Sequence, residues 1–540
     1  MKNLFLSIVL LTSITMAKSQ WNASLNQNLK VVNTSSEVFG FSTAMSDGKT
    51  YVAYWKKVNP PVNYELWLQI LDQNGNKQLG NTGIMISNQI PMSTFVAVEG
   101  TAVDSSDNLY IGVTGTAAGN PGYVFKITPQ GNVVWPNGIM LGEAILPKIL
   151  PLSGGDILVA YAPITEKYTK VQRFNPNGQA VWAAPVEIKS DDLTKETSPI
   201  DLFKISNNEY EIIFNKSIGG TNVHLFAQKI SSDGTILWNT PKQISTKAAS
   251  AVGEYSSFVD GTSVYCAYIG SANNDLYGYL QKINTDGSLP WGADGVNFTA
   301  DTSNFQLGIK TVYTPGSPHI WAIAHYTNPS QNLGGEFVQK FDKNTGARLL
   351  TNTAKQVFPI DDNFMHHAGN LYLVNDNPFF IIQKNTGSNS NTISLNAVSL
   401  NNSGDFAWAQ EYFPVATYPA TKSGITSLPP VNGQNVVVFQ EKKASDSEES
   451  MYAQNFKFSN LSTHEVTRDR LSDHIYPNPA KDVIYIKGAK DQKYEIYNTS
   501  AQMIQTGNIK DSKISVQNLI KGIYYLKIKD QNNKYTFSKE

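Results

Sequence analysis

Short polar turns followed by alternating or apolar stretches recur along the first 459 residues. "SDGKTYVAYW", "DGTSVYCAY" and "NGQNVVVF" are examples, and the pattern occurs eight times. Side chains that alternate with a period of two are typical of strands, and the Val and Tyr enrichment agrees. The pattern therefore predicts β-strands throughout this part of the chain.

A second pattern lies between these stretches and consists of a turn glycine followed four residues later by tryptophan. The glycines are Gly75, Gly131, Gly178, Gly234, Gly287, Gly346 and Gly404. The residues four positions after them are Leu79, Trp135, Trp182, Trp238, Trp291, Leu350 and Trp408. A glutamine precedes most of these turns, at Gln69, Gln172, Gln228, Gln281 and Gln339. Such recurrence within one chain indicates structurally equivalent units.

Each unit reads as four antiparallel strands in about 50 residues. Because so small a sheet cannot bury both faces alone, the units must stack, and radial stacking gives a β-propeller. The eighth copy lacks its last strand, and "WNASLNQNLKVV" from Trp21 resembles the missing piece. We therefore expect an all-β fold in which an N-terminal strand closes an eight-bladed β-propeller.

The repeated residues have structural roles in this interpretation. The glycine supplies the positive φ that the turn needs. The tryptophan is expected on the outer strand, packed against the neighbouring blade, and the glutamine is expected to donate a hydrogen bond.

Composition narrows the possible partners. The chain has 540 residues, a net charge of −1 and only four arginines, Arg173, Arg348, Arg468 and Arg470. Because phosphate and base-edge recognition depend on arginine, no nucleic acid partner is expected. The lone Cys266 lies in a Val/Tyr strand and is expected to be a buried apolar group.

The N-terminus has the features of a secretory signal peptide. Residues 1–19 combine a basic start at Lys2, an apolar run from Leu4 to Leu11 and small residues near Ala17. No other long apolar run follows, so no transmembrane segment is expected.

The repeat pattern ends after residue 459, which gives a propeller over 20–459 and a polar linker over 460–473. Residues 474–540 alternate in short strands, as in a small β-sandwich. "YPNPA" at Tyr476–Ala480 and "SVQNLIKGIYYLKI" at Ser515–Ile528 closely resemble the type A C-terminal sorting domain of the Bacteroidetes type IX secretion system. The resemblance implies that the type IX machinery is a partner and that the chain is secreted or attached to the cell surface.

The repeat also resembles a known propeller type. "KFDKNTGARLL" and the glycine–tryptophan spacing are similar to the tryptophan-docking repeats of eight-bladed propellers of the pyrroloquinoline-quinone type. Quinoprotein dehydrogenases of that type commonly carry a vicinal disulfide beside the cofactor. One cysteine cannot form it, so no cofactor is expected.

The densest candidate cluster is Asp361, Asp362, His366 and His367 in "PIDDNFMHHAG". Histidine and carboxylate can bind metals or transfer protons. Adjacent residues of a strand point to opposite faces, so at most one of the two histidines is expected to face a shared site. A solvated loop is favoured over a site.

His319 and His325 in "PHIWAIAHY" have an even separation, which predicts one strand face for both. They could line a channel, but an ordinary partly buried position is favoured. The acidic loop 442–450 lacks the spacing of a calcium loop. No sialidase is expected, because the propeller holds only Arg173 and Arg348. We assign no catalytic, cofactor-binding or metal-binding residue from sequence.

The leading functional hypothesis is a non-catalytic binding module for glycans or proteins. Loop aromatics such as Trp55, Tyr64 and Trp67 could stack on sugars, although strand packing of Trp67 is favoured. The alternative is a polysaccharide hydrolase or lyase with its site in the channel mouth, since paired carboxylates from distant blades leave no local signature. A structural role in a surface complex is the third possibility.

Overall fold

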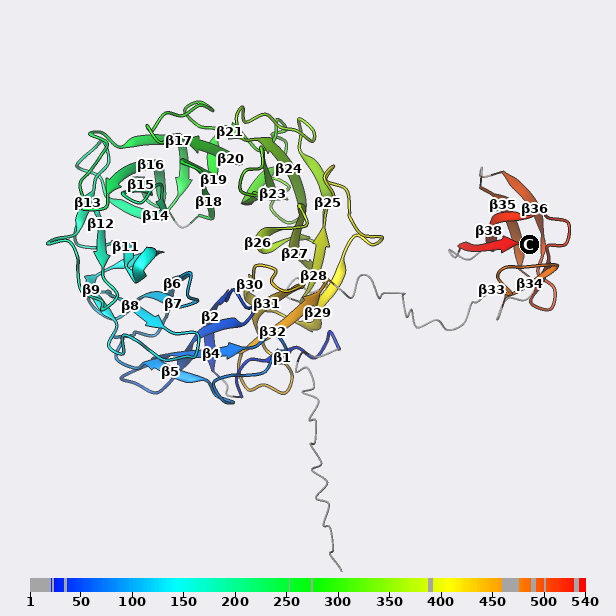
Figure 1. The fold of residues 1–540 in the computed structure, drawn as a ribbon, viewed down its shortest axis with the longest axis horizontal. Helices are drawn as coiled ribbons and strands as arrows, with labels where there is room; N and C mark the ends of the chain where they lie inside the picture. Colours follow the sequence, from blue (N-terminus) through cyan, green and yellow to red (C-terminus); the bar gives the residue numbers. More distant parts are fainter. Residues whose placement is uncertain are drawn as a thin grey trace, which may run out of the picture. The chain divides into compact units, whose positions relative to one another are not determined.

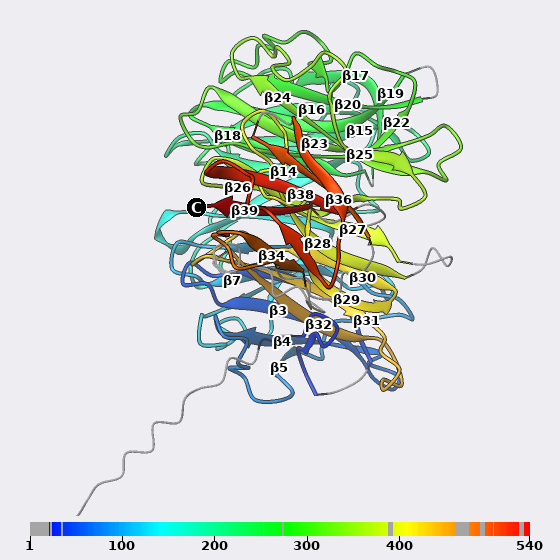
Figure 2. The ribbon, with the colours of Figure 1, turned by 90° about the vertical axis from the view of Figure 1, so that its right-hand side faces the viewer.

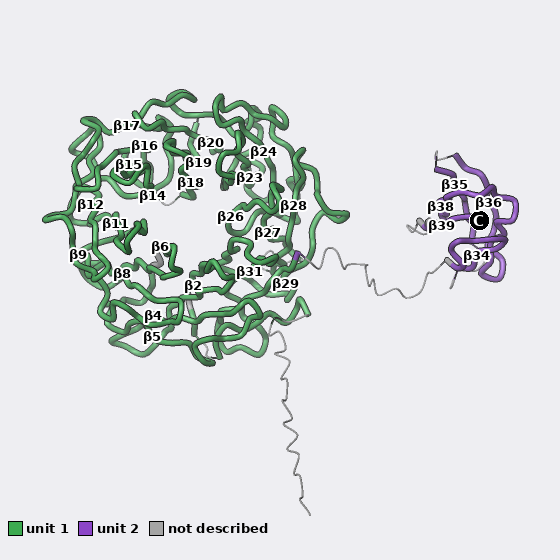
Figure 3. The backbone as a smooth tube through the Cα atoms, viewed as in Figure 1, with its two compact units in different colours: residues 1–457 green, residues 458–540 purple. Residues whose placement is uncertain are grey.

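The computed structural model describes residues 21, 24–33, 36–251, 253–272, 275–386, 392–458, 475–486, 492–499, 502–528 and 534–540. The predicted signal peptide and linker lie outside these residues. The chain divides into two compact units, unit 1 over residues 1–457 and unit 2 over 458–540 (Figure 3). Unit 1 is built of antiparallel sheets, and its one described helix is a 3-10 turn at Ser153–Gly155.

The described strands of unit 1 form six four-stranded sheets and one eight-stranded sheet. The larger sheet joins the strands of residues 197–250 (β14–β17) to those of residues 255–297 (β18–β21) through a single residue pair, Ala248 opposite Ser271. It therefore consists of two four-stranded units, each similar to the other sheets. The sheets follow one another in chain order around a common centre (Figure 1), and β5 and β17 lie on opposite sides of unit 1 in both views (Figure 2).

Each four-stranded unit has a first strand nearest the centre and a fourth strand at the periphery (Figure 1). The first strands are β2 (Glu37–Ala44), β6 (Ala97–Val103), β10 (Ile145–Pro151), β14 (Thr197–Lys204), β18 (Tyr255–Asp260), β22 (Phe305–Val312), β26 (His366–Val374) and β30 (Lys422–Ser427). The second strands are β3 (Thr50–Lys57), β7 (Leu109–Thr114), β11 (Ile157–Ala162), β15 (Glu209–Gly219), β19 (Ser263–Ala272), β23 (His319–Thr327), β27 (Asn377–Asn385) and β31 (Gln434–Glu441).

The outer half of each unit consists of the third and fourth strands. The third strands are β4 (Tyr64–Leu71), β8 (Pro121–Ile127), β12 (Thr169–Phe174), β16 (Asn222–Ser231), β20 (Asp275–Ile283), β24 (Gly334–Asp342), β28 (Ile393–Ser399) and β32 (Ser450–Lys457). The fourth strands are β5 (Ile84–Ser87), β9 (Ile139–Glu143), β13 (Val186–Ile188), β17 (Lys242–Ser250), β21 (Val296–Asn297), β25 (Lys355–Asp361), β29 (Phe413–Ala420) and β1 (Leu29–Lys30).

The core of unit 1 is divided among the interfaces between neighbouring sheets. One buried cluster, for example, joins Tyr110 and Val124 of one sheet to Ile157 and Val159 of the next. Six further clusters join other neighbouring four-stranded units in the same way. Since apolar burial is the main stabilising contribution to folding, each sheet depends on its neighbours.

The repeated tryptophans link one four-stranded unit to the glycine turn of the next. Their indole Nε1–H groups donate to the backbone carbonyl two residues before the next turn glycine, at 2.8–3.2 Å, in the pairs Trp21–Gln73, Trp135–Pro176, Trp182–Ser232 and Trp291–Asn344. Packing against the neighbouring unit is thus confirmed. The expected position on the outer strand is wrong, because Trp135 and its equivalents lie in the bends before the fourth strands.

The turn glycines make room for these rings. All seven have φ between 73° and 91°, a region that disfavours residues with a Cβ atom. A Cβ on Gly234 would come within 3.1 Å of the Trp182 ring. At Gly287 the neighbouring group is the aliphatic part of Lys242 in place of a tryptophan.

The recurring glutamines fix the bend that carries the tryptophan. Gln172 and Gln228 donate from Nε2 to the backbone carbonyls of Trp182 and Trp238 in their own units, at 3.2 and 3.1 Å. Gln281 also reaches the carbonyl of Ile244 in the preceding unit. The predicted role as a hydrogen-bond donor is confirmed.

The N-terminal segment pairs with the last sheet. Leu29 and Lys30 of β1 lie opposite Ala453 and Tyr452 of β32. The Asn28 amide donates to both carboxylate oxygens of Glu441, each at 3.1 Å. Residues near the two ends of unit 1 thus share one sheet.

Unit 2 has seven described strands in two sheets around its own core. They are β33 (Ile475–Tyr476), β34 (Val483–Ile486), β35 (Lys493–Asn498), β36 (Met503–Asn508), β37 (Lys513–Ser515), β38 (Gly522–Ile528) and β39 (Lys534–Lys539). β33, β34 and β37 form one sheet and the other four strands form the second. Ile484, Ile496, Ile514 and Leu526 belong to one buried cluster that includes residues of both sheets.

Candidate functional site

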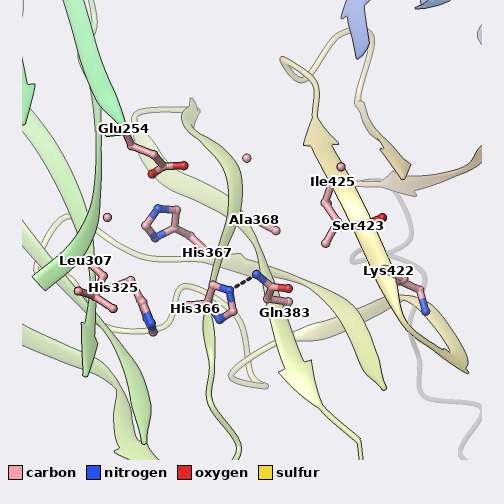
Figure 4. Close-up of a pocket in the computed structure, with 13 residues that line it drawn as sticks. Glu254, Leu307, His325, His366, His367, Ala368, Gln383, Lys422, Ser423 and Ile425 are labelled. Carbon is pink, nitrogen blue, oxygen red and sulfur yellow. Dashed lines mark hydrogen bonds between the residues drawn. The ribbon is translucent and has the colours of Figure 1, made fainter. Parts of the chain in front are cut away.

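A polar cavity of about 410 Å³ lies among the first strands β22, β26 and β30. Its lining includes Glu254, Gly308, His325, His366, His367 and Gln383 (Figure 4). We call it the histidine cavity. Its volume lies within the range of small-molecule sites.

A buried glutamate holds His367 in a fixed orientation. The Nδ1 atom of His367 donates to Oε1 of Glu336 at 2.8 Å, and its backbone N–H donates to Oε2 at 2.9 Å. Glu336 is on β24 and is fully buried. With Nδ1 protonated toward the carboxylate, Nε2 carries a lone pair whenever the ring is uncharged.

His325 and His366 have the same protonation pattern. Their Nδ1 atoms contact the backbone carbonyls of Gly335 and Phe364, each at 3.2 Å. Because a carbonyl can only accept, Nδ1 carries the hydrogen in both rings. The Gln383 amide donates to Nε2 of His366, and the His325 and His366 ring centroids are 4.7 Å apart.

Burial keeps these two histidines uncharged. Loss of solvent, followed by repulsion from His366 and His367, lowers the pKa of His325 to about 3. Loss of solvent also lowers the pKa of His366 to about 4, and His367 contributes. Both rings are therefore neutral near pH 7.

Glu254 brings a carboxylate to the cavity beside His367 (Figure 4). It directly precedes β18, and its Oε2 is 3.5 Å from Nζ of Lys310. A Cβ on Gly308 would lie 3.2 Å from Oε2 of Glu254 and 3.6 Å from Nε2 of His367. The absence of a side chain at Gly308 thus leaves room between these two acceptors.

Lys422 lines the cavity but directs its ammonium elsewhere. Its Nζ is 2.9 Å from Glu441, and both side chains are fully buried. It also donates to the carbonyls of Ile393 and Tyr418, at 3.0 and 2.6 Å. This cation is therefore committed to the sheet that contains β1.

A second cavity, of about 350 Å³, lies among β6, β10, β14 and β18. Its Asp201 accepts a hydrogen bond from Ser257 at 3.1 Å, and burial raises the pKa of the Asp201 carboxyl. Lys148 and Tyr255 also line it. Within the described parts of the chain, no three His, Cys, Asp or Glu side chains are placed to hold a metal ion.

The structure corrects the expectations for His366 and His367. Both side chains line the same cavity, and His367 is only 8% exposed, so the solvated-loop interpretation is wrong. The alternation rule fails because His366 is the first residue of β26 and its ring packs edge-on against Phe364, 5.7 Å away. Asp361 instead accepts hydrogen bonds from Asn363 in the turn.

The other sequence candidates are dispersed. His325 lines the cavity, but His319 is at the opposite end of β23, across from Asp342. Trp55 and Tyr64 are buried, which excludes them as surface stacking platforms. Cys266 is buried as predicted, and burial raises the pKa of its thiol to about 12.

Sequence reasoning missed Glu254, Gly308, Glu336 and Gln383. They come from three successive four-stranded units and share no local motif. The one available signal was Glu336 itself, a charged residue within the strand "GGEFVQKFD". A carboxylate in such a strand needs a partner if it is buried.

Comparison with known proteins identifies unit 2. Residues 474–539 match the family described as "Secretion system C-terminal sorting domain". This type IX sorting domain indicates export across the outer membrane to the cell surface or the extracellular space. Among the residues that the structure describes, no helix is long and apolar enough to cross a membrane. No curated protein sequence matches the chain.

Several solved structures are similar in fold at low identity. An ulvan lyase, described as a new family of polysaccharide lyase, is 12% identical over 83% of this chain and 100% of its own, with a TM-score of 0.42. The propeller domain of the trilobed protease from Pyrococcus furiosus is 9% identical over 68% and 99%, with a TM-score of 0.38. An α-L-arabinofuranosidase of Fusarium graminearum is 10% identical over 59% and 94%, with a TM-score of 0.33.

Proposed function

We propose that the chain is an exported eight-bladed propeller, closed by β1, that binds a carbohydrate in the histidine cavity. The neighbour contacts of the first strands support the closed arrangement, since β2 contacts both β6 and β31. We also propose that the sorting domain is of type A and that the source is a member of the Bacteroidetes.

The observation that carries the proposed binding is the polar lining of the histidine cavity. Three imidazoles, Glu254 and Gln383 surround a space of about 410 Å³. Protein–protein interfaces are broad surfaces, whereas a concave polar cavity suits a small ligand rich in hydroxyl groups. This favours glycans over proteins within the binding hypothesis.

A glycan array with residues 20–540 tests this proposal. We expect retention of a subset of glycans by the parent chain and loss of retention for His367→Ala. His319→Gln is the matched control, because His319 lies outside the cavity, and it should bind like the parent. Retention that survives both His367→Ala and Gly308→Leu would place the binding elsewhere and contradict the proposal.

A second candidate, polysaccharide cleavage, is favoured by the pairing of His367 with Glu336. A carboxylate that accepts Nδ1–H raises the basicity of Nε2, which could then act as a general base. The lining offers Glu254 but no second carboxylate that faces it, so a two-carboxylate hydrolase is not favoured.

Product release separates cleavage from binding. If His367 is a general base, retained polymers should be shortened by the parent, and Glu336→Gln should slow shortening by about 10²–10⁴-fold. Polymers that stay intact after prolonged incubation would show that the chain binds them without cleaving them.

A further inference from the structure

The side chains that line the histidine cavity offer several hydrogen-bond acceptors. His325, His366 and His367 each use Nδ1–H on an acceptor behind the ring. Nε2 therefore has a lone pair in the uncharged rings of His325 and His366, and in His367 when its ring is uncharged. The Gln383 amide already occupies Nε2 of His366. Nε2 of His325, Nε2 of His367 and the Glu254 carboxylate remain as acceptors in the lining.

The hydrogen-bond donors near this set are few. Lys422 directs Nζ to Glu441 and two backbone carbonyls. Lys310 lies 3.5 Å from Glu254 and partly offsets its charge. Ser423 contributes one hydroxyl to the lining, which can donate or accept. The balance of the cavity thus favours a ligand that brings its own donors.

The geometry points to one place for such a donor. Oε2 of Glu254 and Nε2 of His367 both lie within 3.6 Å of the point that a Cβ on Gly308 would occupy. An ammonium group supplies three donors and a positive charge, which suits the Glu254 carboxylate, and one of its donors can reach Nε2 of His367 when that ring is uncharged. A ligand carboxylate or sulfate would place further acceptors against the acceptors of the lining, and Glu254 would repel it.

We propose that the histidine cavity binds the protonated amine of an amino sugar between Glu254 and His367. This inference rests on the proposed carbohydrate binding and names its ligand class. A divalent cation also seeks acceptors, but among the described residues no three ligating groups are placed to hold one. The arrangement therefore favours an organic ammonium.

The protonation state of the lining supports the proposal near neutral pH. The pKa values of His325 and His366, at about 3 and about 4, leave both rings uncharged, so they do not repel a cation. Lys310 is the nearby cation that opposes binding, and its ion pair with Glu254 limits that effect.

Calorimetry with three oligosaccharides of equal length tests the inference: β-1,4-linked glucosamine, its N-acetylated form and a β-1,4-linked glucuronic acid. The full chain from residue 20 is used at pH 7, where part of the amine is protonated. We expect the glucosamine oligomer to bind at least about ten-fold tighter than the N-acetylated form, as for one charge-assisted contact. The acidic oligomer should not bind.

Two variants locate the contact. Glu254→Gln keeps the side-chain shape and should reduce the preference for the amine about ten-fold, while the neutral oligomer binds as before. His319→Gln should change neither affinity. A preference for the amine that Glu254→Gln leaves intact would overturn the assignment.

The remaining outcomes distinguish this inference from the proposed function. Equal or tighter binding of the neutral or acidic oligomer overturns the amino-sugar inference and leaves carbohydrate binding standing. No binding of any glycan, on the array or in calorimetry, overturns both. If Zn²⁺ binds the parent chain and this binding is lost in His367→Ala, the cavity holds a metal ion and the amino-sugar inference is overturned.

Discussion

Hydrogen bonding at one nitrogen of each ring determines what the cavity histidines can do. Because Nδ1 is committed to Glu336 or to a backbone carbonyl, Nε2 is the ring nitrogen left for other contacts. The sequence shows where histidines lie but not which of their nitrogens is protonated. That depends on Gly335, Phe364 and Glu336, which only the fold brings into contact with the rings.

Acid should destabilise the protein partly through His325 and His366. Their folded pKa values of about 3 and about 4 lie below the ordinary value of 6.5. Between these values the unfolded chain binds protons that the folded chain does not, so the free energy of unfolding falls as pH falls from 6.5 toward 4. Urea denaturation at pH 7 and pH 4.5 should show a smaller loss for His325→Gln than for the parent. Equal losses would contradict this account.

Glu211 should act in the opposite direction. Burial raises its pKa from 4.5 to about 8, although Lys229 opposes the shift, and neither carboxyl oxygen has a partner among the described residues. The folded chain keeps a proton that the unfolded chain releases, so this contribution is lost as pH rises from 4.5 to 8.

Replacement by an apolar residue of similar length should remove that loss. Glu211→Met is expected to be more stable than the parent at pH 8 by about 1–3 kcal/mol, the cost of a buried group without a partner. The advantage should shrink at pH 5. Denaturant midpoints at both pH values measure it, and a variant less stable at pH 8 would show that the carboxyl is satisfied.

At the scale of elements, the link between a bend and the next turn repeats around unit 1. The glycine and tryptophan spacing allowed the turns, the strand order and the neighbour packing to be predicted, because those contacts recur at fixed intervals. The predicted position of the tryptophan on the fourth strand was wrong, because Trp135 lies in the bend before β9. Sequence spacing could not separate a bend from the strand beside it.

The Trp182 link offers a quantitative test. Trp182→Ala removes a mostly buried ring and its hydrogen bond to Ser232, and should cost about 3–5 kcal/mol. Trp182→Phe keeps most of the apolar contact and should cost less, although the lost hydrogen bond contributes about 1 kcal/mol. Equal costs in chemical denaturation would show that the indole N–H dominates.

At the scale of the whole molecule, the cavity needs residues from four successive four-stranded units, the last of which contributes Lys422 and Ser423 of β30. Glu254 directly precedes β18, Gly308 and His325 belong to the next sheet, and His367 belongs to the sheet after that. The sorting domain was predictable because its motifs are contiguous in sequence, whereas the cavity exists only once separate sheets are packed together. This explains why sequence reasoning assigned no site residue.

The N-terminal segment should matter more to stability than its two-residue strand suggests. Removal of residues 20–33 would leave one edge of β32 unpaired and Glu441 without the Asn28 amide. We expect a lower melting temperature and self-association through the exposed edge. Lys30→Ala, which loses only a partly exposed ion pair with Asp446, should cost no more than about 1 kcal/mol. A truncated chain that stays monomeric and equally stable would contradict this role.

The pairing of β1 with β32 also sets an order of events during biogenesis. Asn28 and Glu441 are 413 positions apart in the chain, so the sheet they share cannot form until nearly all of unit 1 has emerged. Until then β1 has no strand to pair with, and the unfinished molecule carries an open strand edge. Completion of unit 1 is therefore a late, long-range event in folding.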